Sequence, residues 1–175
     1  MNVIFLAGVH GVGKGYLGAP AAKALGITHR TASQLIREEK GLATWGADKR
    51  TADLDDNQRA LIQAVNKLRA SGNILLDGHF VLRNAIGLLT PLEISVFDQL
   101  KLKGVVLLTN DPQVIVERLA NRDTKSADVA SVAELAAAEL LHAKQVCMTL
   151  KLPLSVLHSP TEDEVVLCIS ERLKP

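Results

Sequence analysis

The sequence has few cysteines, few aromatic residues and almost no net charge. Its 175 residues include two cysteines, one tryptophan, one tyrosine and three phenylalanines, and 20 basic side chains face 19 acidic ones. Cys147 and Cys168 lie in separate helical patterns without a CxxC pair, which favours reduced, buried thiols over a disulfide framework or a zinc site. A formal charge of +1 predicts no nucleic-acid partner, so any cationic site must be local.

Long hydrophobic runs are also absent. The apolar run Val3–Ala7 is too short for a transmembrane helix and lacks the basic region and cleavage site of a signal peptide. We therefore expect a cytoplasmic protein that binds no membrane. Hydrophobic residues make up 47% of the chain, which allows a sizeable core, and the length predicts a single domain over residues 1–175.

The segment Gly8–Lys14, GVHGVGK, directly follows Val3–Ala7 and predicts a P-loop. Its three glycines let backbone N–H groups turn toward phosphate oxygens, and Lys14 stands where an ammonium group reaches the β- and γ-phosphates of a nucleotide. The alanine- and leucine-rich Tyr16–Leu25 predicts a helix whose N-terminus adds partial positive charge. The alternative is a glycine-rich turn that binds nothing, and the strand-before, helix-after context argues against it.

One position departs from the P-loop pattern. After the lysine, the pattern asks for a serine or threonine, whose hydroxyl binds Mg²⁺, whereas this chain has Gly15. The missing hydroxyl argues against ordinary Mg²⁺-dependent turnover more than it argues against nucleotide binding.

Four short apolar runs separated by helical patterns predict an α/β fold. The runs are Val3–Ala7, Ile74–Leu76, Val105–Leu108 and Leu154–Leu157, and their lack of alternation predicts strands buried on both faces. The interleaving predicts a parallel sheet flanked by helices. Together with the P-loop, this predicts a three-layer P-loop NTPase fold. The helical evidence consists of the patterns Leu54–Ala70 and Val132–Leu150, a helix start at Asp111-Pro112 and a capping box in Ser159–Glu162.

Asp77 ends the strand Ile74–Leu76, where P-loop proteins keep a carboxylate that holds Mg²⁺ directly or through water. The simpler alternative is a turn aspartate before Gly78. The strand end and its order after the P-loop favour the metal role. The five histidines show no metal-ligand spacing; His79 could orient a phosphate or a water beside Asp77, or be an ordinary pocket histidine.

Three further segments follow the P-loop in a familiar order: Thr31–Arg37, Leu75–Phe80 and Arg118–Asp123. Together with Gly8–Lys14 they resemble the nucleoside monophosphate kinases, and most closely the archaeal-type adenylate kinases and short-lid relatives, over nearly the whole chain. The resemblance implies transfer of the γ-phosphoryl group of ATP to a nucleoside monophosphate or similar phosphorylated acceptor, with ATP and Mg²⁺ required. Such transfer depends on positioning and cationic stabilisation more than on covalent chemistry.

The same resemblance assigns roles along the chain. It places an acceptor-binding region at about residues 28–70 and a short lid at about 118–130. In the acceptor region, Ser33 and Arg37 match the helix that grips the acceptor phosphate, and Arg83 loosely matches a second acceptor arginine. Arg118, Arg122 and Lys125 match the basic lid; a solvated helix end is the alternative for the two arginines. Trp45 could stack on a base or be partly buried.

The resulting site prediction has three parts. Lys14, Arg118 and Arg122 are the predicted catalytic residues, and Asp77 the predicted metal ligand, through water. The predicted ATP-binding residues are Gly8, His10, Gly11, Val12, Gly13, Lys14, Gly15, Tyr16 and His158. Two other functions stay open: a nucleotide-binding switch with weak turnover, and a kinase for a small metabolite, since the fold alone does not decide the acceptor. The sequence does not predict an oligomeric state.

Overall fold

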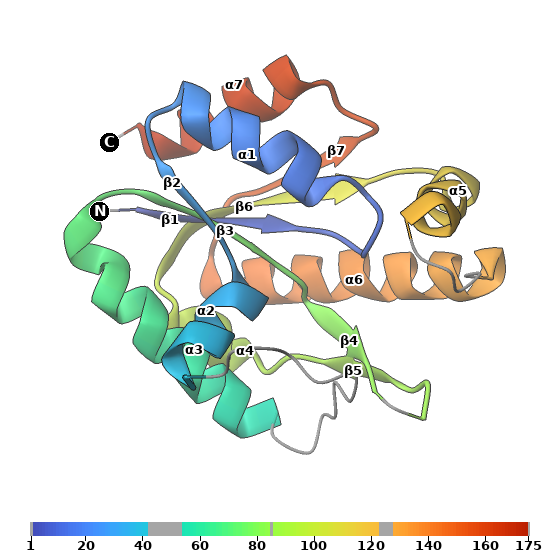
Figure 1. The fold of residues 1–175 in the computed structure, drawn as a ribbon, viewed down its shortest axis with the longest axis horizontal. Coiled ribbons are helices and arrows are strands. Elements are labelled where there is room, and N and C mark those ends of the chain that lie inside the picture. Colours follow the sequence, from blue (N-terminus) through green and yellow to red (C-terminus); the bar gives the residue numbers. More distant parts are fainter. Residues whose placement is uncertain (1, 42–53, 85, 123–127, 175) are drawn as a thin grey trace.

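The computed structural model describes residues 2–41, 54–84, 86–122 and 128–174 (Figure 1). Five parallel strands form one sheet in the order β2-β3-β1-β6-β7. Their bounds are β1 Val3–Ala7, β2 Thr28–Thr31, β3 Ile74–Gly78, β6 Leu102–Thr109 and β7 Leu154–His158. The predicted parallel α/β architecture is confirmed.

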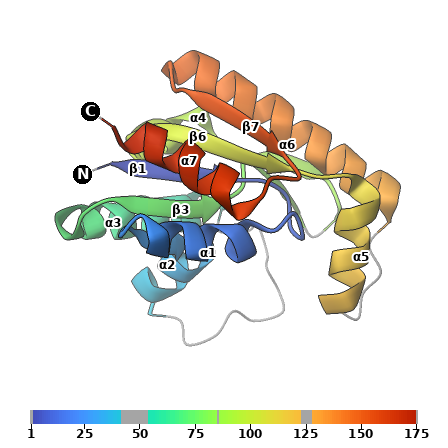
Figure 2. The same cartoon turned by 90° about the horizontal axis from the view of Figure 1, so that it is seen from above.

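Helices cover both faces of this sheet (Figures 1 and 2). One face carries α1 Lys14–Ala24 and α7 Glu162–Leu173, which pack on each other. The other face carries α2 Ala32–Glu39, α3 Leu54–Leu68, α4 Ile94–Gln99 and α6 Val129–Leu150. The remaining elements are α5 Pro112–Arg122, which packs on α6, the 3-10 turn η2 Arg69–Ser71, and a hairpin of β4 Val81–Arg83 and β5 Leu89–Pro91.

The central strand β1 shows why the apolar runs do not alternate. Its Ile4 and Leu6 belong to the core under α1 and α7, whereas Val3 and Phe5 belong to the core on the opposite face. Every residue of β1 is buried, as the sequence predicted. The sheet thus rests on two separate hydrophobic layers, and its carboxyl edge is left for polar side chains.

The edges of the sheet differ from the prediction. β2 was not predicted, because Thr28–Thr31 is polar and its pairing with β3 comes from tertiary context. The prediction of two-face burial is wrong for Leu154–Leu157, because β7 is the opposite edge strand and is partly exposed. The last helix is capped two residues later than predicted: Thr161 and Glu164 form the capping box, and Ser159 lies in the preceding turn with φ 48°.

Both cysteines are buried free thiols, as predicted. Burial raises the pKa of Cys147 to about 11, so this thiol stays protonated near neutral pH. Within the described ranges, no helix combines the length and the apolar composition needed to cross a bilayer.

Candidate active site

The loop between β1 and α1 has the backbone conformation that only glycine adopts easily. Gly8 has φ 143° and Gly13 has φ 111°, and a Cβ atom at Gly8 would lie 2.7 Å from the Leu108 carbonyl oxygen. Gly13 is the N-cap of α1 and offers no side-chain cap, so the first N–H groups of the helix stay open to an anion. The loop therefore fits a phosphate group.

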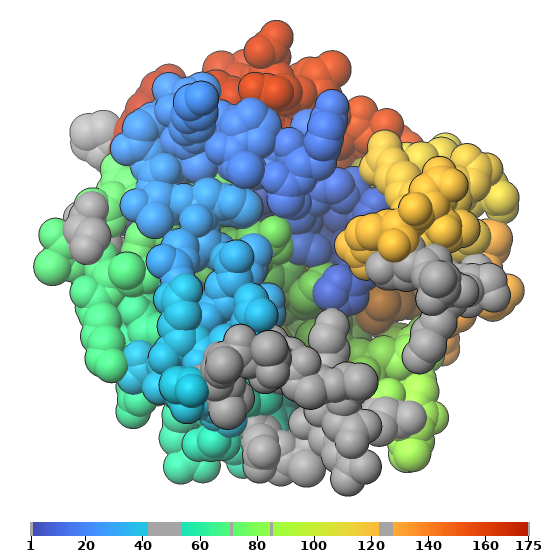
Figure 3. Space-filling model, viewed as in Figure 1, coloured from blue at the N-terminus to red at the C-terminus, as the bar shows by residue number. Residues whose placement is uncertain are grey.

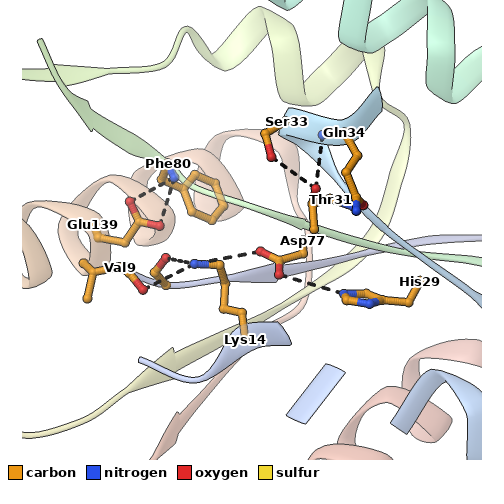
Figure 4. Close-up of polar contacts among 10 residues, drawn as sticks. Val9, Lys14, His29, Thr31, Ser33, Gln34, Asp77, Phe80 and Glu139 are labelled. Carbon is orange, nitrogen blue, oxygen red and sulfur yellow. Dashed lines mark hydrogen bonds and ion pairs between the residues drawn. The ribbon is translucent and has the colours of Figure 1, made fainter. Parts of the chain in front are cut away.

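Lys14 lies inside this loop and is 8% exposed. Its Nζ donates hydrogen bonds to the carbonyl oxygens of Gly8 (2.6 Å) and Val9 (3.3 Å) and lies 3.8 Å from Asp77 Oδ1 (Figure 4). Burial lowers the pKa of Lys14, and the nearby Asp77 carboxylate opposes that shift. The ammonium group is held at the centre of the loop, next to the carboxyl end of β3.

Asp77 lies at the end of β3 as predicted and is buried at the carboxyl edge of the sheet. Burial raises its pKa to about 6, although Lys14 acts in the opposite direction. His29 of β2 approaches it, with Nε2 3.9 Å from Asp77 Oδ2, and burial lowers the pKa of His29 (Figure 4). In the described ranges, no three histidine, cysteine or acidic side chains gather as a metal site, so a metal role for Asp77 stays a prediction that relies on water or substrate oxygens.

The raised pKa of Asp77 predicts a specific pH dependence of stability. Folding raises this pKa from 3.8 to about 6, so the stabilisation is full below about pH 4 and is lost as the pH rises through about 6. Asp77→Asn removes this dependence. From about pH 4 to 7, the unfolding free energy of the wild type should fall relative to the variant by about 2 kcal/mol. Urea unfolding of both proteins across this range measures the difference; parallel curves would contradict it.

Gly15 occupies the first turn of α1, and open space surrounds it. A Cβ atom added at Gly15 would meet no atom of the described residues within 4 Å, and its φ is not in the left-handed region. The absence of a hydroxyl is therefore not forced by packing. The next residue, Tyr16, points outward with 84% exposure.

A cavity of about 890 Å³ opens beside the P-loop. It lies between α1, α2, α3, α4 and α5, and Figure 3 shows the face on which α1, α2 and α5 surround the P-loop. The predicted site residues that line it are His10, Gly11, Gly13, Lys14, Gly15, Tyr16, Ser33, Asp77, Arg37, Arg83, Arg118 and Arg122. Gly8, Val12 and His158 are not among its lining residues.

The arginines of α5 lie on the P-loop side of this cavity. Arg118 Nη1 donates a hydrogen bond to the Val12 carbonyl oxygen (3.0 Å), which holds the side chain against the loop. Arg122 lines the same cavity, and its charge contributes to the lowered pKa of Lys14. Lys125, the third predicted lid cation, lies outside the described residues, as does Trp45 of the acceptor region.

The acceptor side of the cavity contains Arg37, Ser33 and Arg83. Arg37 of α2 is half-buried and makes no hydrogen bond or ion pair within the described part of the chain. Ser33 Oγ lies 3.1 Å from Thr31 Oγ1. Arg83 is held by the Gly87 carbonyl oxygen (2.5 Å) and by Glu134 of α6 (3.0 Å). The roles of all three toward an acceptor stay predictions; Arg37 has the geometry best suited to an anion.

Two histidines meet at the mouth of the P-loop. The ring centroids of His10 and His79 are 4.2 Å apart, and both rings line the cavity. His158 lies elsewhere, with Nδ1 3.3 Å from Thr109 Oγ1 and Nε2 3.8 Å from Asp111 Oδ1. His158 does not line the cavity, and its role in ATP binding stays a prediction.

Glu139 of α6 is a site residue that sequence reasoning missed. It is 1% exposed, and its carboxylate accepts hydrogen bonds from the backbone N–H of Phe80 (2.9 Å; Figure 4) and from that of Val81 (2.7 Å). Burial raises its pKa, and these hydrogen bonds and the charge of Lys14 oppose the shift. Glu139 thus fixes the turn after Asp77 against α6. A lone glutamate in the apolar stretch 135–141 was the available signal.

Comparison with known proteins finds similarity at two levels, in sequence and in structure. An adenylate kinase from Methanothermobacter thermautotrophicus is 27% identical over 141 residues, which are 77% of this chain and 76% of that kinase. A gluconokinase structure from Sinorhizobium meliloti superposes with a TM-score of 0.54 at 17% identity, over 95% of this chain and 87% of its own. The structure of a candidate kinase from Chloroflexus aurantiacus superposes with a TM-score of 0.60 at 12% identity, over 99% of this chain and 98% of its own. At such identities the structural likeness shows the fold alone.

The family is shown by a sequence profile rather than by these structures. The profile of the AAA domain family matches residues 7–136, which include the P-loop, Asp77 and α5. The match covers more than half of the chain, and the observed P-loop and parallel sheet agree with it. The protein therefore belongs to the AAA domain family and has the P-loop fold that its kinase neighbours share.

Proposed function

We propose that this protein is a phosphotransferase that moves the γ-phosphoryl group of ATP to a nucleoside monophosphate. The observation that carries the proposal is a cavity lined both by the buried Lys14 of the P-loop and by Arg37 of α2, which has no partner among the described residues. A donor phosphate at the loop and an acceptor phosphate at Arg37 would share one space. The low-identity adenylate kinase relative supports the same function.

The residues divide the work between the two phosphates. The N–H groups at the start of α1 and the Lys14 ammonium bind the donor phosphates. Arg118 and Arg122 bring positive charge to the P-loop side, where charge develops during transfer. Arg37 fixes the acceptor phosphate with a planar guanidinium that can bind two oxygens. The donor and acceptor are thereby aligned in a cavity partly closed to water.

A bound Mg²⁺ would supply positive charge that offsets the negative charge of the donor phosphates. Asp77 is the residue suited to hold it, because its carboxylate lies at the end of β3 beside Lys14. With a pKa of about 6, Asp77 is mainly ionised at neutral pH and available to a cation. Gly15 has no side-chain oxygen, so a water molecule would have to take the place of the usual P-loop hydroxyl.

A metabolite kinase is the second candidate function. The fold likeness to a gluconokinase favours it, since P-loop kinases of this architecture differ in the acceptor they take. Both candidates use the same donor half and differ at Arg37 and the walls around it.

Restoring the missing hydroxyl tests whether Gly15 limits turnover. Gly15→Ser should be accommodated, because a Cβ atom at this position meets no described atom within 4 Å. We expect tighter Mg²⁺-ATP binding and about tenfold faster transfer, for a recovered interaction of about 1.4 kcal/mol. Gly15→Ala is the matched control, since it adds the Cβ without the oxygen. The gain should shrink as Mg²⁺ saturates; equal rates for the serine and alanine variants at low Mg²⁺ would contradict a metal-ligand effect.

The experiment that separates these functions measures ADP release with a panel of acceptors, beside calorimetric ATP binding. A phosphotransferase acting on nucleotides releases ADP fast only when a suitable monophosphate is present. A metabolite kinase responds to sugar acids instead. A regulatory switch binds ATP and releases ADP slowly with every acceptor, which would exclude the proposed function.

A further inference from the structure

The acceptor half of the cavity has mostly apolar walls. Side chains from α2, α3 and α4 and from the residue after α4 form them: Ile36, Leu61, Val96, Phe97 and Leu100. A ligand rich in hydroxyl groups would lose its water against these walls and gain few hydrogen bonds in return. The walls suit a flat, largely apolar ring.

Gln58 interrupts this apolar lining. It lies in the first half of α3, is 9% exposed and lines the cavity. Its Nε2 is buried without a hydrogen-bond partner among the described residues, whereas the adjacent Asn57 accepts a hydrogen bond from Lys40 Nζ (2.7 Å). A buried amide without a partner destabilises a fold, so its position in the wall of a ligand cavity calls for an explanation.

A ligand would provide that explanation. Gln58 and Arg37 line the same cavity from α3 and α2, two helices that pack against each other. Arg37 offers a cation for a phosphate, the walls offer apolar surface, and Gln58 offers a neutral group that both donates and accepts hydrogen bonds. A glutamine amide can pair with two edge atoms of a heterocyclic base, as it does with adenine in nucleic-acid complexes.

We propose that Gln58 is a specificity-determining residue that hydrogen-bonds the ring edge of a heterocyclic base on the acceptor. The inference rests on the proposed phosphotransfer and deepens it, because it names the residue that would recognise the base of the acceptor and would disfavour a polyhydroxylated sugar acid. Arg37 binds its phosphate, and rotation of the Gln58 amide brings its donor or its acceptor to the base.

Gln58→Met tests this role, because methionine keeps the length of the side chain and removes the amide. For the preferred nucleoside monophosphate, KM should rise about 5- to 150-fold, as expected for loss of a good contact to a base edge. The KM for ATP and the inhibition constant of ribose 5-phosphate, which has no base, should not change. Preference among bases should shrink, and the melting temperature should stay the same or rise.

Gln63→Met is the matched control, since Gln63 is an exposed residue of the same helix outside the cavity lining. An equal loss for ribose 5-phosphate and the monophosphates would overturn the role of Gln58, as would a wild-type preference for gluconate over every monophosphate. If no acceptor receives a phosphoryl group, the proposed function itself is wrong. In that case, calorimetric binding of the same monophosphates to the wild type and to Gln58→Met still tests the contact between Gln58 and the base. If the wild type binds none of them, the proposed role of Gln58 is wrong.

Discussion

Lys14→Ala is expected to abolish most phosphotransfer, with kcat/KM lower by about 10²- to 10³-fold, the loss typical of removing a key electrostatic group. The reason is geometric: the Lys14 ammonium is buried at the centre of the loop, 2.6 Å from the Gly8 carbonyl oxygen and 3.8 Å from Asp77 Oδ1. In the proposed function it is the group that binds the donor phosphates. Calorimetric titration with ATP measures the loss of ATP affinity, and a coupled assay of ADP release measures the loss of turnover.

Lys23→Ala is the control for this prediction, because Lys23 is an exposed lysine of the same helix. Its removal should leave both ATP affinity and turnover unchanged. If Lys14→Ala keeps its fold, as judged by thermal melting, and binds ATP as tightly as the wild type, the P-loop is not the donor site.

Arg37→Ala should raise the acceptor KM by about 30- to 150-fold and leave ATP affinity unchanged. A bidentate, charge-assisted contact to a phosphate contributes about 2–3 kcal/mol. Arg37 is suited to such a contact, because it lines the cavity and has no partner among the described residues. Initial rates over a matrix of ATP and acceptor concentrations measure both constants.

Arg59→Ala provides the comparison, since Arg59 is an exposed arginine of α3 outside the cavity lining. It should behave as the wild type. A fall in ATP affinity for Arg37→Ala, with acceptor dependence untouched, would show that the donor and acceptor sides have been exchanged.

The sequence predicted the P-loop and the strands beside it well, because these elements depend on local backbone chemistry. A P-loop is recognisable from glycine positions and one lysine, and β1 and β3 are recognisable because both of their faces are buried. The position of Asp77 follows from its place at the end of β3. These features are fixed within a few residues of chain.

Glu139 and Gln58 could not be assigned in the same way. Glu139 acts on Phe80, 59 positions away in the sequence, and nothing near it in the chain marks that contact. Gln58 becomes noticeable only when α3 is placed against the cavity and the amide has no partner among the described residues. The strand β2 was missed for a related reason, since its polar residues pair with β3 only in the folded protein.

The central claim is that phosphate moves from ATP to an acceptor in this cavity. The most direct measurement follows a γ-labelled phosphoryl group from ATP, with Mg²⁺ and each nucleoside monophosphate in turn, and separates the products by chromatography. The account predicts label in a nucleoside diphosphate for the wild type, far less for Lys14→Ala and for Arg37→Ala at low acceptor concentration, and little free phosphate. Label that appears only as free phosphate, or stays on ATP with every monophosphate, would contradict it.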